Sequence, residues 1–421
     1  TREAAPEKTV LKIEAFIQNV SEVILGMSTE VKAFFAAIEG FIFNSNSDNT
    51  YKLRMDDKRR HHNAFSNVVG AWETLDEYFE VLANAMQQLA SVTGKLSKYD
   101  IPRLDDHIHA LSAAASYLTQ THQMLDAFVR HPDSNMIYWI NNANSLEWMS
   151  LQAAPLHVGS MMETYLWQQK ESVILTSATL RTAGSFDFLK ERLYAEDVEA
   201  IALGSPFDYK NSTLVYIPED MPLPTDNTYQ RAVERGIVEL AAALNGRVLV
   251  LFTSYTQLRE TAANISPRLA LGNIVVYDQA SGGSREALLD SFRSTEKAVL
   301  LGTRSFWEGV DIPGEDLSAL VIARLPFAVP NDPIFAARSG TYNDAFQQYA
   351  VPDAILRFRQ GFGRLIRTKT DRGVVTIFDS RVIHKSYGRK FLEALPDCTI
   401  QYGSLSDLHI AAKRWLEIDP S

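Results

Sequence analysis

Apolar residues recur at alternating steps of three and four through the N-terminal third of the chain. Three such series run over residues 10–38, 65–89 and 104–129, and each places its apolar side chains on one face of a helix. A polar run at 44–49 separates the first series from the second, and a turn signal at Pro102 separates the second from the third. The pattern predicts three long amphipathic helices, as in an autonomous helical bundle or a dimerising coiled coil.

After these series comes a pair of aromatic-rich runs at 136–140 and 146–151, which flank an asparagine-rich segment at 141–144. Two short runs around such a segment predict a β-hairpin. We interpret its aromatic side chains as core of a following sheet rather than as a platform on which nucleic-acid bases stack.

From about residue 155 the pattern changes to short apolar runs that alternate with helical segments such as 229–244 and 285–292. This alternation predicts a doubly wound parallel sheet with right-handed crossovers. The predicted strands cover residues 173–177, 213–217, 247–252, 274–277, 298–302, 318–323 and 373–379.

An arginine-rich run near the C-terminus carries the most specific candidate chemistry. It opens like a helix, with Pro352 in the first turn and Asp353 beside it. On a continuous helix, four side chains share one face: Arg357, Gln360, Arg364 and Arg367. Gly361 and Gly363 would each cost about 1 kcal/mol in a helix interior, which is accounted for if another surface comes very close. The stripe predicts a phosphate site, and the alternative is a solvated charged face.

Two strand ends supply further candidates. The predicted strand 298–302 runs into 303–314, a loop rich in glycine, acidic and aromatic residues. Ligands of open parallel sheets lie at the carboxyl ends of strands, where such loops are found. The predicted strand 173–177 ends in Ser177-Ala178-Thr179, a sequence that gains meaning only from its order ahead of the other motifs.

In this order the motifs resemble the C-terminal part of superfamily 2 helicases of the XPD/DinG group, closest to the bacterial DinG type. Segments similar to the family's motifs III, IV, V and VI are Ser177–Thr179, 248–255, 302–314 and 360–367. Residues 323–333 resemble a proline-rich loop typical of the DinG side. The resemblance covers about residues 155–421.

The resemblance implies an α/β fold, namely a complete RecA-like lobe of the P-loop NTPase type preceded by an all-helical Arch-like insertion. The implied domains are a helical Arch-like domain at 1–150, a C-terminal remnant of the first RecA-like lobe at 151–204, and the second lobe at 205–421. The implied protein is a bacterial, cytoplasmic, nucleoid-associated ATP-dependent DNA helicase of DNA repair.

The resemblance also implies roles for single residues on the nucleotide side. Arg364 and Arg367 would stabilise charge on the phosphoryl group in transfer, with Gln360 contacting the nucleotide. Further nucleotide contacts fall on Asp311, Glu308 and Gly309, although Glu308 is equally well explained as a solvated loop residue. Ser177, Ala178 and Thr179 would couple the nucleotide state to closure of the two lobes.

On the nucleic-acid side the implied contacts lie in motifs IV and V. The residues that would hold the backbone of single-stranded or forked DNA are Thr253, Ser254, Tyr255, Thr303 and Arg304. Tyr255 or Trp307 would offer a stacking face, the alternative for Trp307 being packing beneath the loop. In this group translocation runs 5′ to 3′.

The chain departs from the family pattern at its start. It has no Gly-Lys-Ser/Thr loop and no Asp-Glu-Ala-His box; Thr93–Leu96 and Leu104–His107 only imitate them. Phosphoryl transfer in such motors needs the lysine and a carboxylate on the metal. We therefore expect a fragment that shares ATP and Mg²⁺ with a first lobe elsewhere and has no ATPase activity alone. The alternative is a nonenzymatic nucleic-acid-binding or scaffold module.

Composition narrows the remaining options. Cys398 is the single cysteine, so the chain itself holds no disulfide and no cysteine-based metal site, and the iron–sulfur cysteines of many relatives lie upstream in family order. The net charge of −10 argues against nonspecific coating of nucleic acid, so binding needs a local basic groove. The basic cluster at 54–62 either touches DNA or is solvated. No apolar run of about 18 residues predicts a membrane helix.

Overall fold

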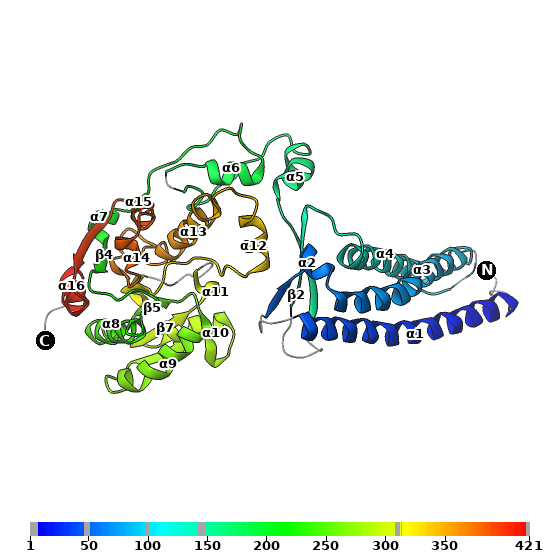
Figure 1. Ribbon diagram of the computed structural model, residues 1–421, viewed down its shortest axis with the longest axis horizontal. Coiled ribbons are helices and arrows are strands. Elements are labelled where there is room, and N and C mark those ends of the chain that lie inside the picture. Colours follow the sequence, from blue (N-terminus) through cyan, green and yellow to red (C-terminus); the bar gives the residue numbers. More distant parts are fainter. Residues whose placement is uncertain are drawn as a thin grey trace. The chain divides into compact units, whose positions relative to one another are not determined.

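The computed structural model describes residues 7–45, 51–97, 99, 101–141, 149–182, 184–307, 312 and 314–417. The chain forms two compact units (Figure 1). One comprises Thr1–His157 together with Asn331–Ala337, and the other comprises Val158–Pro330 together with Arg338–Ser421.

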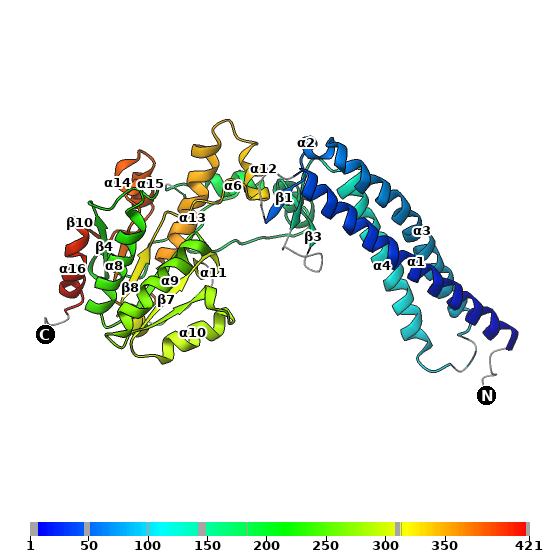
Figure 2. The ribbon, with the colours of Figure 1, turned by 60° about the horizontal axis from the view of Figure 1, so that its bottom comes forward.

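The first unit is built on the three predicted helices, α1 (Glu7–Ser45), α3 (Ser66–Gly94) and α4 (Leu104–Val129). They run side by side, and α3 packs against both of the others (Figure 2). Phe34 of α1 and Trp72 of α3 are fully buried in the shared core. The steps of three and four therefore form the helical faces that the sequence predicts. Between α1 and α3 lie the short helices α2 (Asp57–Arg60) and η1 (Asn63–Phe65).

The unit is not helical throughout, because an antiparallel sheet of order β1-β2-β3 closes one end of it. Its strands are β1 (Lys52–Arg54), β2 (Met136–Asn141) and β3 (Ser150–Pro155). The predicted hairpin forms, but its second strand begins at Ser150 rather than at 146, and residues 142–148 lie outside the described part. Tyr138 and Ile140 pack into the helical core, so this hairpin belongs to the helices and not to the later sheet.

A segment from the second half of the chain completes this unit. Residues 331–337 include most of α12 (Pro333–Ser339), and Ile334 and Ala337 pack against Trp139 of β2. The Asp332 carboxylate accepts hydrogen bonds from the amides of Ile334 and Phe335, and it pairs with the Lys52 ammonium at 3.0 Å. The chain therefore leaves the second unit at Pro330, contributes to the first, and returns.

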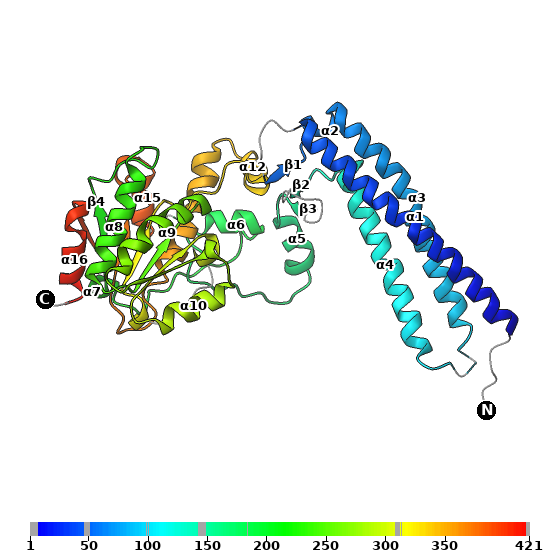
Figure 3. The same ribbon diagram turned by 90° about the horizontal axis from the view of Figure 1, so that it is seen from below.

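The second unit contains a seven-stranded sheet of order β10-β4-β9-β8-β5-β7-β6, in which every neighbouring pair is parallel (Figure 3). The strands are β4 (Thr213–Pro218), β5 (Val248–Leu251), β6 (Val275–Asp278), β7 (Ala298–Gly302), β8 (Ala319–Ile322), β9 (Gly373–Ile377) and β10 (Thr399–Gly403). The doubly wound α/β fold expected from the sequence is confirmed.

Helices cover both faces of this sheet and bury a separate apolar core on each. On one face lie α8 (Tyr229–Ala243), α9 (Tyr255–Ala270) and α16 (Leu408–Trp415). On the other lie α10 (Arg285–Ser294), α11 (Arg304–Trp307), α13 (Val351–Phe362), α14 (Arg381–His384) and α15 (Gly388–Glu393). The remaining elements are α5 (Gly159–Met162), η3 (Glu163–Trp167), α6 (Asp187–Leu193), α7 (Tyr209–Ser212), η4 (Gln279–Ser281), η5 (Gly314–Asp316), η6 (Phe346–Ala350) and η7 (Leu405–Asp407).

Two differences from the predicted strands stand out. The edge strand β10 was not predicted, because its three central residues, 400–402, are exposed and its sequence lacks a continuous apolar run. Residues 173–177 form no strand, and Ile174 is 87% exposed. Within the described part of the chain this apolar run has no sheet to join, so it stays irregular. No described helix is long and apolar enough to cross a membrane.

Candidate functional site

The arginine-rich run does not form one helical stripe, which corrects the sequence-based expectation. Helix α13 ends at Phe362, so Arg357 and Gln360 lie on it, whereas Arg364 and Arg367 lie in the turn beyond it. The turn buries the side chains of Leu365 and Ile366 in the lobe core, and this burial draws the chain away from the helix axis. On the helix, Arg357 pairs with Asp353 at 2.7 Å.

The close approach predicted by the two glycines holds for one of them. A Cβ atom at Gly361 would lie 2.6 Å from Cε3 of Trp307, so the indole ring needs glycine there. At Gly363 the nearest atom would be the Arg359 carbonyl oxygen at 3.4 Å, which is ordinary contact. Trp307 is 3% exposed and donates its Nε1–H to the Phe252 carbonyl at 3.1 Å. The interpretation of Trp307 as a packing residue is therefore correct, and its ring offers no stacking face.

The turn after α13 is held by contacts that the sequence did not reveal. The Nε of Arg364 donates to the Trp307 carbonyl at 3.1 Å. The Asp371 carboxylate accepts from the amides of Arg367 and Thr368 at 2.7 and 2.8 Å. A Cβ atom at Gly314 would lie 2.1 Å from Oδ1 of Asp371, so the carboxylate fills the space beside that glycine. This anchors the turn to the end of the loop that follows β7.

The pKa of Asp371 reflects the same contacts. Burial acts to raise it, but hydrogen bonds from the Thr368 side chain and from the amides of Arg367 and Thr368 outweigh burial and lower it. The carboxylate is therefore charged at neutral pH while it holds the arginine-bearing turn. Its sequence signal is the spacing Thr368 to Asp371, which is typical of a side-chain-capped turn.

The Ser177-Ala178-Thr179 segment lies against α13 through an arginine that was given no role from the sequence. Arg359 donates to the carbonyl oxygens of Arg181 at 2.6 Å and Ala178 at 3.3 Å. Burial and the neighbouring Arg181 lower the pKa of Arg359. Thr179 donates its amide hydrogen to the Ser177 hydroxyl at 3.3 Å. The structure therefore brings this segment and the helix of the arginine motif together.

Three predicted nucleotide contacts cannot be placed. Glu308, Gly309 and Asp311 lie outside the described residues. Elsewhere in the described ranges, no group of three or more His, Cys, Asp or Glu side chains is arranged to hold a metal ion.

A groove opens at the carboxyl ends of the neighbouring strands β5, β7 and β6. It has a volume of about 420 Å³ and is lined by Tyr255, Gln279, Arg285, Thr303, Arg304 and Ser305. Three of the five residues predicted to contact DNA thus share one cavity. The other two, Thr253 and Ser254, directly precede Tyr255, and the Ser254 hydroxyl caps α9 by accepting from the Gln257 amide. Tyr255 is 50% exposed and lines the groove.

Gln279 organises this groove and was missed from the sequence. Its Oε1 accepts from the amide and the hydroxyl of Thr303 at 2.9 and 2.7 Å, and its Nε2 donates to the Ser305 hydroxyl at 2.8 Å. Arg285 donates to the Ser305 carbonyl at 3.4 Å. The available signal was a polar pair, Asp278-Gln279, at the end of a strand and ahead of two glycines.

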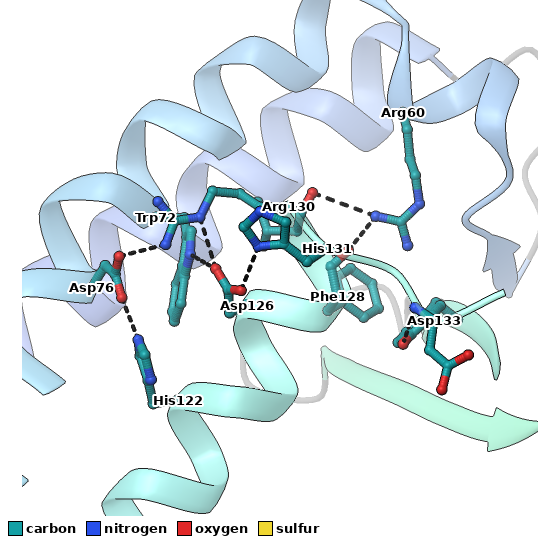
Figure 4. A network of polar contacts seen from close by, with 11 residues as sticks. Arg60, Trp72, Asp76, His122, Asp126, Phe128, Arg130, His131 and Asp133 are labelled. Atoms are coloured by element: carbon teal, nitrogen blue, oxygen red, sulfur yellow. Dashed lines mark hydrogen bonds and ion pairs between the residues drawn. The ribbon is translucent and has the colours of Figure 1, made fainter. Parts of the chain in front are cut away.

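Arg60, a member of the basic cluster at 54–62, makes contacts inside the first unit. Arg60 donates to the carbonyl oxygen of Phe128 near the end of α4 (Figure 4) and to that of Val129. Its guanidinium lies over the rings of Phe128 and Tyr138. Arg60 therefore joins helices within the first unit. His61 and His62 line a shallow cavity of about 400 Å³ beside it.

A parallel sheet covered by helices on both faces has the architecture of a RecA-like lobe. Residues 237–398 match the family described as Helicase C-terminal domain. A solved structure of XPD helicase has a similar fold, with a TM-score of 0.51 and 15% identity, over 90% of this chain and 64% of that one.

Curated bacterial proteins are similar in sequence. The chain is 29% identical to the 3′-5′ exonuclease DinG of Bacillus subtilis over 433 residues, which cover 97% of this chain and 44% of that protein. It is 31% identical to the ATP-dependent DNA helicase YoaA of Haemophilus influenzae, covering 79% of this chain and 51% of that protein. Over most of its length the chain is thus similar to bacterial helicases of the DinG and YoaA type, and it spans about half the length of these relatives.

Proposed function

We propose that this chain supplies the second RecA-like lobe and the Arch-like domain of an ATP-dependent DNA helicase that moves 5′ to 3′ along single-stranded or forked DNA. Within it we assign residues 1–150 to the Arch-like domain, 151–204 to the first lobe and 205–421 to the second. Relatives named as ATP-dependent DNA helicases support the activity. The groove at the ends of β5, β7 and β6 is the observation that carries the proposal.

The groove suits a single strand of nucleic acid. Arg285 and Arg304 supply positive charge, hydroxyl groups line its floor, and the half-exposed ring of Tyr255 offers a face for a base. The chain as a whole carries a net charge of −10, so affinity for a polyanion must come from such a local site. We assign the DNA backbone to this groove, with Thr253 and Ser254 at its border.

The arginine turn suits the phosphates of ATP. The Arg364 side chain donates its Nε–H to the Trp307 carbonyl, and Asp371 holds the backbone amide of Arg367, so both arginines start from an ordered turn. Preorganised donors of this kind stabilise charge that develops in a transition state. Gln360 lies on the last turn of α13, and Arg359 links that helix to Ser177–Thr179. We assign Gln360, Glu308, Gly309 and Asp311 to nucleotide contacts and Ser177–Thr179 to coupling.

The proposal places the phosphate-cradling lysine and the magnesium ligands in a first lobe outside these residues. The purified chain should accordingly hydrolyse no ATP, with or without DNA, in a coupled phosphate-release assay. DNA-stimulated turnover that Arg364→Ala abolishes would overturn this assignment. In a protein that joins the chain to a complete first lobe, Arg367→Ala should lower turnover by about 10³–10⁵. A joined protein that binds DNA without turnover would instead support a nonenzymatic scaffold.

DNA binding by the chain itself tests the groove. A fluorescent oligothymidine of about 20 nucleotides should bind at about 50 mM salt and dissociate as salt rises, because phosphate contacts release counterions. Arg304→Ala should weaken this binding several-fold. The matched control is Arg389→Ala on α15, whose side chain is 85% exposed and lies outside the groove lining. If both substitutions weaken binding equally, the groove is not the DNA-binding site.

A further inference from the structure

Gln279 determines whether the hydroxyls of Thr303 and Ser305 donate or accept a hydrogen bond in the groove. Three contacts reach its amide group: the backbone N–H of Thr303, the hydroxyl of Thr303 and the hydroxyl of Ser305. A backbone N–H only donates, so the atom facing it at 2.9 Å must be the amide oxygen. This contact fixes which way the Gln279 amide points, and its NH₂ group must then face Ser305.

The orientation of the Gln279 amide determines whether each hydroxyl acts as donor or acceptor. The Thr303 hydroxyl lies 2.7 Å from an oxygen that can only accept, so its one proton is committed to Gln279. The Ser305 hydroxyl lies 2.8 Å from a group that can only donate, so it accepts there and keeps its own proton. Both residues line the groove, but Thr303 is only 5% exposed, whereas Ser305 is partly exposed.

A phosphate diester offers acceptors only, so it is held by groups that still have a proton to give. We propose that Ser305, and not Thr303, donates the hydroxyl hydrogen bond to a DNA phosphate in this groove, and that Gln279 is the positioning residue that leaves the Ser305 proton free. This inference rests on the proposed DNA-binding function. It revises the sequence-based assignment of Thr303 to a supporting position beneath the bound strand.

A matched pair of substitutions tests the assignment in the oligothymidine binding assay. Ser305→Ala removes the free donor and should weaken binding roughly tenfold, since a hydrogen bond to a charged group contributes strongly. Thr303→Val keeps the β-branched shape and should change binding by less than about twofold, because only the bond to Gln279 is lost. Ser305→Thr retains a hydroxyl and should restore binding. Thermal melting of each variant checks that the lobe stays folded.

The substitution Gln279→Glu tests whether Gln279 keeps the Ser305 hydroxyl free to donate. A carboxylate still accepts from the amide and the hydroxyl of Thr303. It also accepts from the Ser305 hydroxyl, which then no longer has a proton to donate to a phosphate. Binding at about pH 7.5 should fall at least as far as in Ser305→Ala. As pH falls toward the ordinary glutamate pKa of about 4.3, the protonated side chain again donates to Ser305, and affinity should recover relative to the unsubstituted chain.

The failures are distinguishable. An unsubstituted chain that does not bind the oligothymidine at low salt overturns the proposed DNA-binding groove, and this inference falls with it. A chain that binds but loses more affinity with Thr303→Val than with Ser305→Ala overturns this inference alone. A Gln279→Glu variant whose loss is independent of pH overturns the positioning role of Gln279.

Discussion

The two units of this chain bury apolar residues in different ways. Every residue of β4, β5, β7, β8 and β9 in the second unit is buried, because helices cover both faces of the sheet. In the first unit, helix α1 buries Phe34 and Ile38 almost completely, yet Val10 and Ile17 of the same apolar series are 41% and 47% exposed. The same periodicity therefore forms a helix along its whole length but a core along only part of it.

Polar contacts also differ between the units. Helices α3 and α4 are joined by a chain of ion pairs in which Arg130 bridges Asp76 and Asp126 (Figure 4). His122 pairs with Asp76, and Trp72 donates to Asp126 at 3.2 Å. In the lobe, the fully buried Asp379 binds Arg381 and accepts from the Leu325 amide, tying the end of one strand to the end of its neighbour. Side-chain pairs thus join two helices in the first unit, whereas in the lobe the buried carboxylate joins the ends of two strands that already share a backbone ladder.

The largest expected effect is on the helical unit. Trp72→Ala should destabilise it by about 3–5 kcal/mol, because the fully buried indole leaves a cavity and its bond to Asp126 is lost. Calorimetry should show a lowered transition for this unit and an unchanged one for the lobe. Tyr117→Ala, at a position of α4 that is 70% exposed, is the control and should leave both unchanged. A single transition that moves as a whole would show that the units unfold together.

A smaller loss is expected in the lobe when Gly361 is replaced. Gly361→Ala forces a methyl group against Trp307, and overpacking of this kind costs about 1–3 kcal/mol. Gly363→Ala meets only ordinary contacts and should be close to neutral. Urea unfolding followed by tryptophan fluorescence measures both. Equal losses would mean that the turn, and not the indole, sets the need for glycine.

Acid should weaken the helical unit through Asp126. Burial acts to raise the pKa of this residue, but hydrogen bonds from His131, Arg130 and Trp72 outweigh it and lower the pKa from 3.8 to about 2. A depressed carboxyl pKa adds stability above about pH 4, which is lost as pH falls toward 2. Asp126→Asn should flatten the dependence of melting temperature on pH in that window. Asp105→Asn, at an exposed position of α4, should leave it as steep as before.

The smallest effect concerns the segment that joins the first unit from far along the chain. Lys52→Ala breaks an ion pair with Asp332 whose side chains are 37% and 22% exposed, and it should cost less than about 1 kcal/mol. Asp332→Ala also removes acceptors for two amides at the start of α12 and should cost about 1 kcal/mol. Hydrogen exchange at Ile334 and Phe335 measures both. Faster exchange in Lys52→Ala than in Asp332→Ala would contradict this order.

Sequence patterns were sufficient for the elements that depend on local periodicity. The three long helices and most of the parallel strands follow from steps of three and four or from short apolar runs, because burial on one face or on both imposes those spacings. Gly361 likewise predicted that another side chain packs closely against its helix, because a neighbouring surface accounts for the cost of glycine there. The order of motifs was enough to indicate the helicase family.

Only the tertiary structure decided where these patterns end and what they meet. Arg364 and Arg367 continue the helical spacing in sequence, yet burial of Leu365 and Ile366 turns the chain before them. Asp332 and Ala337 belong to a unit whose other residues end at His157, so they join it from far along the chain, a contact that no local pattern encodes. Gln279 gained its place through hydrogen bonds to Thr303 and Ser305 on a neighbouring strand end, because parallel strands bring together residues that are distant along the chain.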